Sequence, residues 1–425
     1  MTPLRVAVLS RAVAGLHGHG GLERHVADLV RHLDARGAQV TLITRRPHGA
    51  APAVTAAAAG TARTDWSLQL GQRTRVLMVP YLTFPFAGRR GTTVLDRSTA
   101  YPLFGLRAGR RAAGLVQAGE IDWVYGLGAS ALGYAHRRRR GAASAPFIFN
   151  PQGLEEFGGP DGTYGGSPLK GLGYIPLQAA VRTCASAADR VIATDRVLVP
   201  LVERHLHVPS SRLVVVPNAI DLDMCDRLAG PADGESIRRR HGLDLAEPLL
   251  LSVGRVEQNK GLHVLASALG RLTGTPWRWV HVGEGPNRPT LERAIDVGRI
   301  GDRVILAGRT TDHDLHAWYE AATLFVHPTL YEGSSLVTLE AMAHRRAVVA
   351  TEAGGLPDKV RPGTTGWLVP PGDAAALAMA LARALERPAD LPAMGRAGRE
   401  LAERDFAWPV VADRLLDIGA ALVGR

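Results

Sequence analysis

Short apolar segments alternate with segments of helical pattern along the whole chain, and this alternation constrains the fold more than any other feature. The helical pattern is clearest at Leu22, Val26, Leu29, Val30 and Leu33, directly after the first apolar segment. Strands that alternate with helices form parallel sheets covered by helices, so the sequence predicts an α/β fold. The predicted strands cover residues 5–9, 39–44, 75–79, 121–125, 147–149, 190–194, 213–216, 248–253, 277–282, 303–306, 323–326, 347–350 and 367–369.

The predicted strands fall into two series, which indicate two Rossmann-like domains. A short segment at residues 208–212 separates the series, so we expect domains at residues 1–207 and 208–407. The length of 425 residues suits two domains of ordinary size. Because ligands of such sheets bind beyond the carboxyl ends of the strands, the expected site is the cleft between the two domains.

Composition excludes several classes of protein. With 46% apolar and 21% charged residues, the chain is not of the disordered type. No apolar run approaches the ~18 residues of a spanning helix, and the first apolar run is too short for a signal peptide, so we expect a cytoplasmic protein. Cys184 and Cys225 form no CxxC pair, which argues against a disulfide scaffold or a zinc ribbon. We expect no obligatory metal and no permanently bound cofactor.

The chain is strongly basic, with a net charge of +10. Its lysines are Lys170, Lys260 and Lys359, so arginine supplies the other 47 of the 50 basic residues (50 − 3). A lysine in this background is a better candidate than an arginine for a specific chemical role. The excess charge indicates anionic partners such as phosphates or acidic lipid. No recognised nucleic-acid-binding module is found, so no nucleic acid partner is expected.

A glycine-rich turn at residues 17–24, HGHGGLER, follows the first predicted strand. Gly18, Gly20 and Gly21 leave free amides at the start of the next helix, which is a typical anion site. The alternative is a plain strand-to-helix turn. A nicotinamide-binding turn fits poorly because the third glycine of GxGxxG is replaced by Glu23. An NADP-binding variant stays open because Arg45 and Arg46 end the second strand.

The segment 253–261, VGRVEQNKG, places Arg255 and Lys260 between a strand and the following helix. Two cations beside the amides of a helix N-terminus suit a diphosphate. They would also stabilise the charge that grows on a departing phosphate group. The alternative is a solvated basic turn, which is a better explanation for Arg255 than for Lys260.

The segment 327–343, HPTLYEGSSLVTLEAMA, is the most specific of the chain. Glu332 lies at the entrance of an expected helix that starts near Ser334, and a sugar hydroxyl can donate to its carboxylate. Glu340 lies eight positions later, where it can accept from both hydroxyls of a ribose. The alternatives are a capping role for the serines and a buried Glu340 paired with a fixed cation. The amides expected to receive ligand oxygens belong to Gly333, Ser334, Ser335 and Leu336.

Further strand-to-helix turns come to the same sheet edge. They include residues 281–288 and 306–312, whose backbone can hold a nucleobase, and the glycine pair of residues 352–358. Asn218 and Asp221, after the strand at 213–216, form either an Asx turn or part of the site. The group of turns is more informative than any one of them.

These residues carry a resemblance to a known family. The second half of the chain resembles the retaining, nucleotide-sugar-dependent glycosyltransferases of family 4, which have the GT-B fold. GRVEQNKG, EGSSLVTLE, PNAID, VGEGP, LAGR and AGGLPDKVRPGTTGWLVPPGD stand in family order, densely between Leu213 and Asp373. In the first half, HGHGGLER and NPQGLEE match more thinly. The GT-B fold has its active site in the cleft between two Rossmann-like domains, and its last helix, here 408–425, packs back on the first domain.

The resemblance implies roles for individual residues. Arg255 and Lys260 would hold the diphosphate, Glu332 the donor sugar and Glu340 the ribose. Many members carry a histidine where this chain has Gln152, which cannot titrate near neutrality, so no protein base is assigned there. The expected catalytic residues are Arg255, Lys260 and Glu332. The residues expected to bind the donor are Gly20, Gly21, Gln152, Asn218, Gly308, Arg309, Gly333, Ser334, Ser335, Leu336 and Glu340.

The function implied is retaining transfer of a hexose from a UDP- or GDP-sugar to a hydroxyl of a lipid-linked, polysaccharide or small-molecule acceptor. A GT-B epimerase or phosphorylase and a non-catalytic sugar-nucleotide-binding protein are the alternatives. A run of four arginines at 137–140 predicts docking on anionic lipid at the inner face of the plasma membrane, and the alternative is a solvated face. Its expected companions are Arg89, Arg90, Arg107, Arg110, Arg111, Trp66, Tyr81, Phe84 and Phe86.

Overall fold

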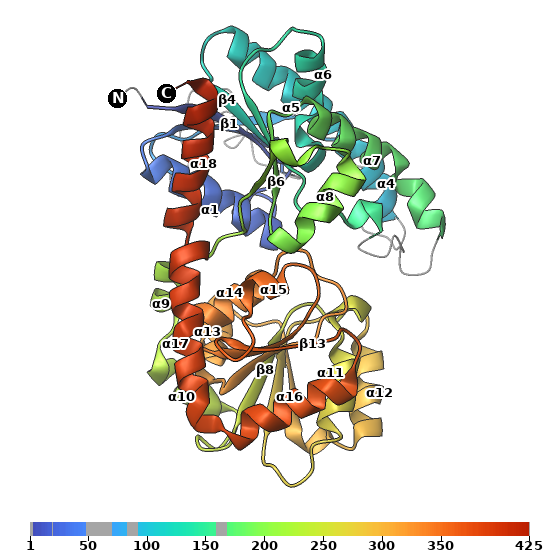
Figure 1. Cartoon of the computed structure of the whole chain (residues 1–425), viewed down its shortest axis with the longest axis vertical. Coiled ribbons are helices and arrows are strands. Elements are labelled where there is room, and N and C mark those ends of the chain that lie inside the picture. Colours follow the sequence, from blue (N-terminus) through green and yellow to red (C-terminus); the bar gives the residue numbers. More distant parts are fainter. Residues whose placement is uncertain (1–2, 19, 48–69, 83–91, 159–167, 425) are drawn as a thin grey trace. The chain divides into compact units, whose positions relative to one another are not determined.

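Two parallel sheets, each in a unit of its own, organise the chain (Figure 1). The computed structural model describes residues 3–18, 20–47, 70–82, 92–158 and 168–424. Unit 1 comprises Met1–Pro217 and Trp408–Arg425, and unit 2 comprises Asn218–Ala407. The predicted α/β class with two Rossmann-like domains is confirmed. None of the helices in the described ranges is long and apolar enough to cross a membrane.

The sheet of unit 1 has seven strands in the order β3-β2-β1-β4-β5-β6-β7. Its central strands β1 and β4 are buried except for Arg5 at the start of β1, because helices cover both faces, and they therefore appear in the sequence as nearly continuous apolar runs. The strands are β1 (Arg5–Leu9), β2 (Gln39–Arg45), β3 (Arg75–Val79), β4 (Trp123–Leu127), β5 (Phe147–Asn150), β6 (Arg190–Ala193) and β7 (Leu213–Val215). The helices are α1 (Gly21–Ala35), α4 (Thr92–Ser98), α5 (Ala100–Gln117), α6 (Leu132–Arg139), α7 (Pro168–Ala187), α8 (Val199–Leu206) and α18 (Trp408–Val423).

The last helix of the chain, α18, completes unit 1. It packs against α1, where the Trp408 ring stacks on His32 with ring centroids 5.6 Å apart. At its other end Gly419 lies so close to the Trp123 ring of β4 that an added Cβ would approach within 2.7 Å. Figure 1 shows α1 and α18 side by side.

The sheet of unit 2 has six strands in the order β10-β9-β8-β11-β12-β13. Helices α11, α12 and α16 share one apolar core with it, to which α17 adds Leu391, and α9, α10, α13 and α14 pack against one another. The strands are β8 (Leu249–Val253), β9 (Arg278–Val282), β10 (Val304–Gly308), β11 (Leu324–His327), β12 (Ala347–Thr351) and β13 (Gly366–Val369). The helices are α9 (Leu222–Leu228), α10 (Pro231–Arg240), α11 (Leu262–Leu269), α12 (Arg288–Gly298), α13 (Asp312–Ala321), α14 (Leu336–Ala343), α15 (Leu356–Lys359), α16 (Ala374–Glu386) and α17 (Leu391–Leu401).

One strand assignment and the domain boundary that depended on it were wrong. The strand predicted at 213–216 opens the second series in the sequence, but as β7 it pairs in parallel with β6 at the edge of the first sheet. An apolar run predicts a strand but does not indicate which sheet the strand joins. Because α8 connects β6 to β7, β7 joins the sheet of unit 1 as its next βα repeat. Unit 1 therefore continues to Pro217 rather than ending at residue 207.

Candidate active site

The strand order of unit 2 defines one position at the carboxyl edge of its sheet that favours ligand binding. The chain extends the sheet from β8 through β9 to β10 on one side, and from β11 through β12 to β13 on the other. The helices that follow β8 and β11, α11 and α14, belong to different packing layers, so the chain reverses direction across the sheet at this switch point. Lys260 follows β8 and Glu332 follows β11, so both stand at the switch point, where sheets of this kind bind ligands.

Lys260 and Glu332 meet directly. The Lys260 ammonium donates to Glu332 Oε2 at 2.7 Å, and the side chains are 23% and 14% exposed. His327, the last residue of β11 and nearly fully buried, shares the same oxygen at 2.9 Å. Because a carboxylate accepts only, the His327 Nε2 carries the proton and donates it. A partly exposed cation thus stands against a carboxylate that a buried imidazole holds in place.

The carboxyl group of Glu332 is ionised well below neutral pH. Burial raises its pKa, but the hydrogen bond from His327 and the charge of Lys260 act more strongly together and lower the pKa from 4.5 to about 2. Glu332 is therefore an acceptor for hydroxyl groups at neutral pH and cannot serve as a general acid there.

The lowered pKa predicts a specific loss of stability in acid. An acid whose pKa falls on folding stabilises the fold above its unfolded pKa, here 4.5, and this contribution disappears as the pH falls toward the folded pKa of about 2. Between neutral pH and about pH 3, we expect the wild type to lose roughly 2 kcal/mol more unfolding free energy than Glu332→Gln. Urea denaturation at the two pH values measures this difference, and parallel losses in the two proteins would contradict it.

Backbone hydrogen bonds join the two loops that carry this pair. The Asn259 carbonyl, next to Lys260, accepts from the Leu330 amide at 2.7 Å and from the Thr329 hydroxyl at 2.9 Å. The Thr351 hydroxyl at the end of β12 donates to the Thr329 carbonyl at 2.6 Å. Loops after β8, β11 and β12 therefore form one connected support for Lys260 and Glu332.

Two glycines allow this close approach of backbone. Gly261 has a φ of +63°, and an added Cβ would lie 2.0 Å from the Pro328 carbonyl oxygen. Gly354 has a φ of +52°, and an added Cβ would lie 1.7 Å from the Glu332 carbonyl oxygen. Each position needs both the left-handed conformation and the missing side chain.

The helix after Glu332 begins slightly later than expected. α14 starts at Leu336, and Ser335 is its N-cap, whose hydroxyl accepts from the Thr338 amide at 3.2 Å. Ser334 lies one residue earlier and accepts from the Lys359 ammonium at 3.1 Å. Ser335 is buried in its capping role, so Ser334 and the amides of Gly333 and Leu336 are the better candidates to contact a ligand.

Glu340 and Arg255 have partners away from the central pair. Glu340 is 4% exposed and accepts from the Tyr319 hydroxyl at 2.9 Å. The Arg255 side chain is 72% exposed and pairs with Glu257 at 3.1 Å. Four side chains were expected to bind the donor together. Lys260 and Glu332 contact each other directly, whereas Glu340 and Arg255 contact Tyr319 and Glu257 instead.

Gly308 and Arg309 lie at the same carboxyl edge, where Gly308 ends β10 and Arg309 follows it. Gly308 has a φ of +70°, and its carbonyl accepts from the Gly283 amide at 2.8 Å. This bond ties the turn after β10 to the turn after β9. Arg309 is exposed. Asn218 lies at the start of unit 2 and is buried, and its Oδ1 has no hydrogen-bond partner among the described residues.

The glycine-rich turn of unit 1 opens α1 as expected. Gly20 is the N-cap and has no side chain to occupy the helix amides, and Gly21 is the first helical residue. A side chain at Gly20 would collide with the Glu23 carboxylate. His17 is fixed between the Val13 amide and the Arg45 carbonyl, and burial lowers its pKa to about 4. His19 of this motif lies outside the described residues.

Gln152 occupies an unusual position after β5. Its φ is +64°, a region that residues other than glycine rarely enter, and its amide donates to Asn150 Oδ1 at 2.8 Å. Its side-chain Nε2 is buried and has no hydrogen-bond partner in the described part of the chain. Strain and an unsatisfied donor at one residue are typical of a ligand contact.

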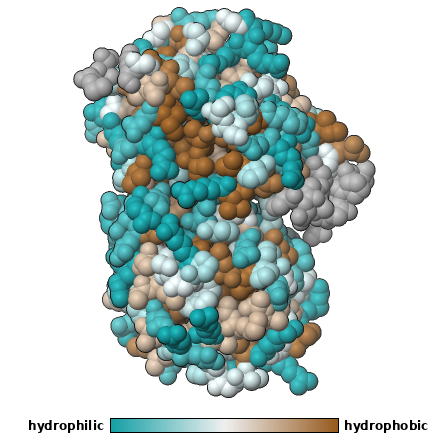
Figure 2. Space-filling view, in the orientation of Figure 1, coloured by the Kyte–Doolittle hydropathy of each residue, from teal (hydrophilic) through white to brown (hydrophobic). Residues whose placement is uncertain are grey.

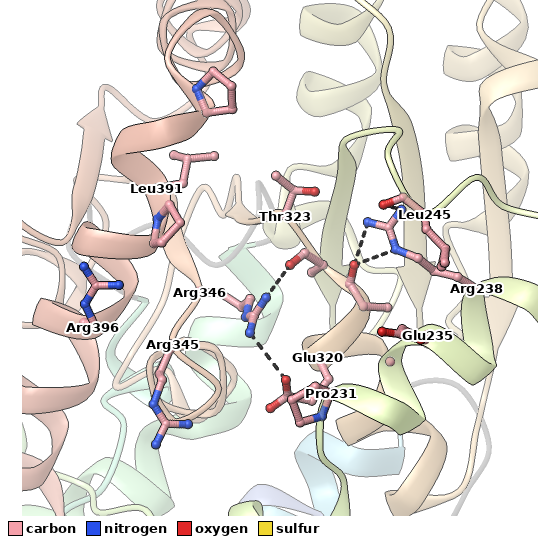
Figure 3. A pocket seen from close by; sticks show the side chains of 15 residues that line it. Pro231, Glu235, Arg238, Leu245, Glu320, Thr323, Arg345, Arg346, Leu391 and Arg396 are labelled. Atoms are coloured by element: carbon pink, nitrogen blue, oxygen red, sulfur yellow. Dashed lines mark hydrogen bonds and ion pairs between the residues drawn. The ribbon is translucent and has the colours of Figure 1, made fainter.

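A cavity of about 610 Å³ lies at the opposite edge of the unit 2 sheet (Figure 3). Thr323, directly before β11, and Arg346, directly before β12, line it at the amino ends of the strands. Arg238 and Arg346 on its wall donate to backbone carbonyls, as the dashed lines show. This cavity is therefore separate from the Lys260–Glu332 pair.

His327 and Lys359, which contact Glu332 and Ser334, lie within motifs quoted from the sequence, residues 327–343 and 353–373, but the sequence predicted no role for either. His327 ends a strand and Lys359 ends a four-residue helix, so neither position belongs to a periodic pattern that would indicate its contact. The one signal for Lys359 was the rarity of lysine in the chain.

Comparisons with known proteins agree across both units. Residues 19–224 match the family described as Glycosyltransferase Family 4, and residues 247–387 match Glycosyl transferases group 1. A D-inositol 3-phosphate glycosyltransferase of Mycolicibacterium paratuberculosis is 30% identical over 430 residues, which cover 97% of this chain and 89% of that protein. An alpha-maltose-1-phosphate synthase of Mycolicibacterium smegmatis is 32% identical over 58% of this chain and 67% of its own length.

Solved structures show the same fold. A sucrose-phosphate synthase from Thermosynechococcus elongatus superposes with a TM-score of 0.74 at 23% identity, covering 99% of both chains.

Proposed function

The chain belongs to the family 4 glycosyltransferases of the GT-B fold, and from this premise we propose that it transfers a hexose from a UDP- or GDP-sugar to a hydroxyl group with retention of the anomeric configuration. The observation that carries the proposal is the ion pair between Lys260 and Glu332 at the switch point of the unit 2 sheet. A cation for phosphate and a fixed acceptor for sugar hydroxyls stand together where α/β sheets bind ligands.

In the proposed reaction, the bond between the anomeric carbon and the diphosphate oxygen breaks on the face where the acceptor oxygen forms its new bond. A departing phosphate oxygen takes the acceptor proton, so no protein base is needed. Lys260, the more exposed Arg255 and the amides at the start of α14 would stabilise the charge of the leaving diphosphate. Glu332 would accept from hydroxyls of the donor sugar, an assignment supported by its ionised state at neutral pH.

The remaining donor contacts are proposed from position. Glu340 would accept hydrogen bonds from the ribose hydroxyls after its hydrogen bond from Tyr319 breaks. The turn at Gly308 and Arg309 would contact the base. In unit 1, the unsatisfied Gln152 amide is the proposed contact to a sugar or acceptor hydroxyl. Gln152 donates hydrogen bonds there and exchanges no protons near neutral pH.

A lipid-linked acceptor at an anionic membrane surface is the acceptor class that the surface of unit 1 favours. Apolar side chains of α4, α5 and α7 are strongly exposed, and Figure 2 shows apolar surface over α7. They are Leu95 at 51%, Leu103 at 42%, Leu172 at 64% and Ile175 at 53%. α4 packs against both α5 and α7, and contiguous apolar patches on a surface are typical of interaction sites.

The arginine run at the end of α6 adds positive charge to unit 1. Arg137 and Arg140 line a cavity of about 430 Å³ with Arg110, whereas Arg138 is committed to Asp189. Of the aromatic and basic companions named from the sequence, Trp66, Phe84, Phe86, Arg89 and Arg90 lie outside the described residues. Sedimentation with anionic and with neutral liposomes tests this docking, and absence of pelleting at moderate salt would contradict it.

The reaction itself is tested by incubating the protein with UDP- and GDP-sugars. We expect release of the nucleoside diphosphate to rise strongly when a hydroxyl acceptor is added, and the product to keep the anomeric configuration of the donor, as read by NMR. Donor binding without turnover would favour a non-catalytic protein, and conversion of the donor sugar without transfer would favour an epimerase. Either result overturns the proposal.

A further inference from the structure

Three side chains that bind metals well converge in the interior of unit 2. Cys225 comes from α9, His316 from α13, and His344 from the C-cap of α14. Their exposed fractions are 0%, 1% and 1%, and their ligating atoms all lie within 4.8 Å of one another. The chain contains only 2 cysteines, so this meeting of a thiol with two imidazoles is not a consequence of composition.

The orientation of His344 suits a metal ligand. Its Nδ1 donates to Glu320 Oε1 at 2.6 Å, so its Nε2 presents a lone pair toward His316 Nδ1, 2.7 Å away. Glu320 is itself held by Arg346 at 3.4 Å, as Figure 3 shows. A carboxylate behind a histidine is the arrangement that fixes the ring of a metal ligand and raises its basicity.

We propose that Cys225, His316 and His344 bind a zinc ion. One thiolate and two imidazoles are a donor set that zinc prefers. Tetrahedral ligands of zinc stand about 3.4–3.7 Å apart, so modest side-chain rotations suffice. His316 gives up its hydrogen bond to His344, and its proton moves from Nδ1 to Nε2 so that Nδ1 can bind the metal. Binding releases the thiol proton of Cys225 to solvent, and a water completes the fourth position.

The proposed ion would stabilise the support of the candidate active site. It ties together three helices whose ligands lie far apart in the sequence, at positions 225, 316 and 344. α14 also carries Glu340 and begins at the Ser335 cap beside Glu332. The zinc proposal depends on the geometry of this cluster alone and stands whether or not the proposed transferase activity is found.

The first test uses the wild-type chain. Protein purified from zinc-supplemented cells without a metal-binding tag is expected to retain about one zinc per chain by mass spectrometry. After chelation, Co²⁺ should produce a thiolate-to-cobalt charge-transfer band and strong visible bands of a tetrahedral site, and zinc should abolish both. Zinc in large excess over its Kd should raise the Tm of the metal-free protein by roughly 5 °C or more.

Variants locate the metal. Cys225→Ser should lose the charge-transfer band and the bound zinc, and His344→Gln should weaken zinc binding at least 100-fold. Cys184→Ser is the matched control, because Cys184 is the other buried cysteine and lies in unit 1. This variant should keep the retained zinc, the cobalt charge-transfer band and the zinc-induced rise in Tm of the wild type.

Two outcomes overturn the proposal. If the wild type shows neither retained zinc nor a charge-transfer band, the cluster is only a hydrogen-bonded histidine pair beside a thiol. Zinc binding that survives in folded Cys225→Ser would assign the metal to another site. If Cys225→Ser does not fold, the cobalt spectrum of the wild type and the response of His344→Gln decide the question.

Discussion

Replacing Lys260 with alanine is expected to lower the rate of sugar transfer by about 100-fold to 1000-fold. The ammonium would lie beside the leaving diphosphate, where it stabilises charge that is larger in the transition state than in the bound donor. It is also the cation nearest to Glu332 in the described structure, at 2.7 Å. Most of the loss should therefore appear in kcat rather than in KM.

The Lys260→Ala protein should stay folded. Glu332 keeps its hydrogen bond from His327, so the cost is about 1–3 kcal/mol, a fraction of the stability of an ordinary domain. Arg293→Ala, which removes an exposed cation on α12, is the matched control and should transfer sugar at the wild-type rate. Nearly normal transfer by folded Lys260→Ala would rule out its assignment as a catalytic residue.

Replacing Gly354 with alanine is expected to cause the largest loss of stability of any single methyl group near the site. The new Cβ would lie 1.7 Å from the Glu332 carbonyl oxygen, so the loops after β11 and β12 must separate. Left-handed strain and the collision together should cost about 2–5 kcal/mol, which corresponds to a fall in Tm of roughly 5–15 °C. Turnover should fall as well, because the displaced backbone carries Glu332.

Gly363→Ala separates the two causes. Gly363 has a φ of +75°, but an added Cβ meets no atom within 4 Å. This variant suffers the left-handed strain alone and should lose about 1–2 kcal/mol with normal turnover. Equal losses of stability in the two variants, measured by thermal and urea denaturation, would show that the contact with Glu332 contributes nothing.

The fold was largely predictable because the strands of parallel sheets are buried on both faces. Runs such as Leu249–Val253 and Ala347–Thr351 are apolar except for one small hydroxyl residue each, so each is visible without knowledge of its neighbours. The pairing of one strand with another leaves no comparable pattern in the sequence, and for this reason the sheet predicted for β7 was wrong. The start of α14 was placed early because Ser334 and Ser335 are both good caps, and only the bond to the Thr338 amide distinguishes them.

The candidate site was predictable where a motif has a fixed local spacing. Lys260 and Glu332 each stand in a strand-to-helix turn, and the topology then brings them together across 72 positions. His327 opens the same motif as Glu332, but the contact between them depends on how the loop folds, which the residue types alone do not indicate. The same limit applies to Cys225, His316 and His344, whose distance in the sequence conceals their meeting in the structure.

The position of α18 has a consequence for biosynthesis. Most of unit 1 is synthesised before unit 2, yet the helix that packs against α1 and Trp123 is synthesised after unit 2. During translation, the side of α1 that carries His25 and His32 therefore stays without its Trp408 partner until the ribosome has completed unit 2 and then Trp408–Val423. Unit 1 reaches its complete packing only after all of unit 2 has been made.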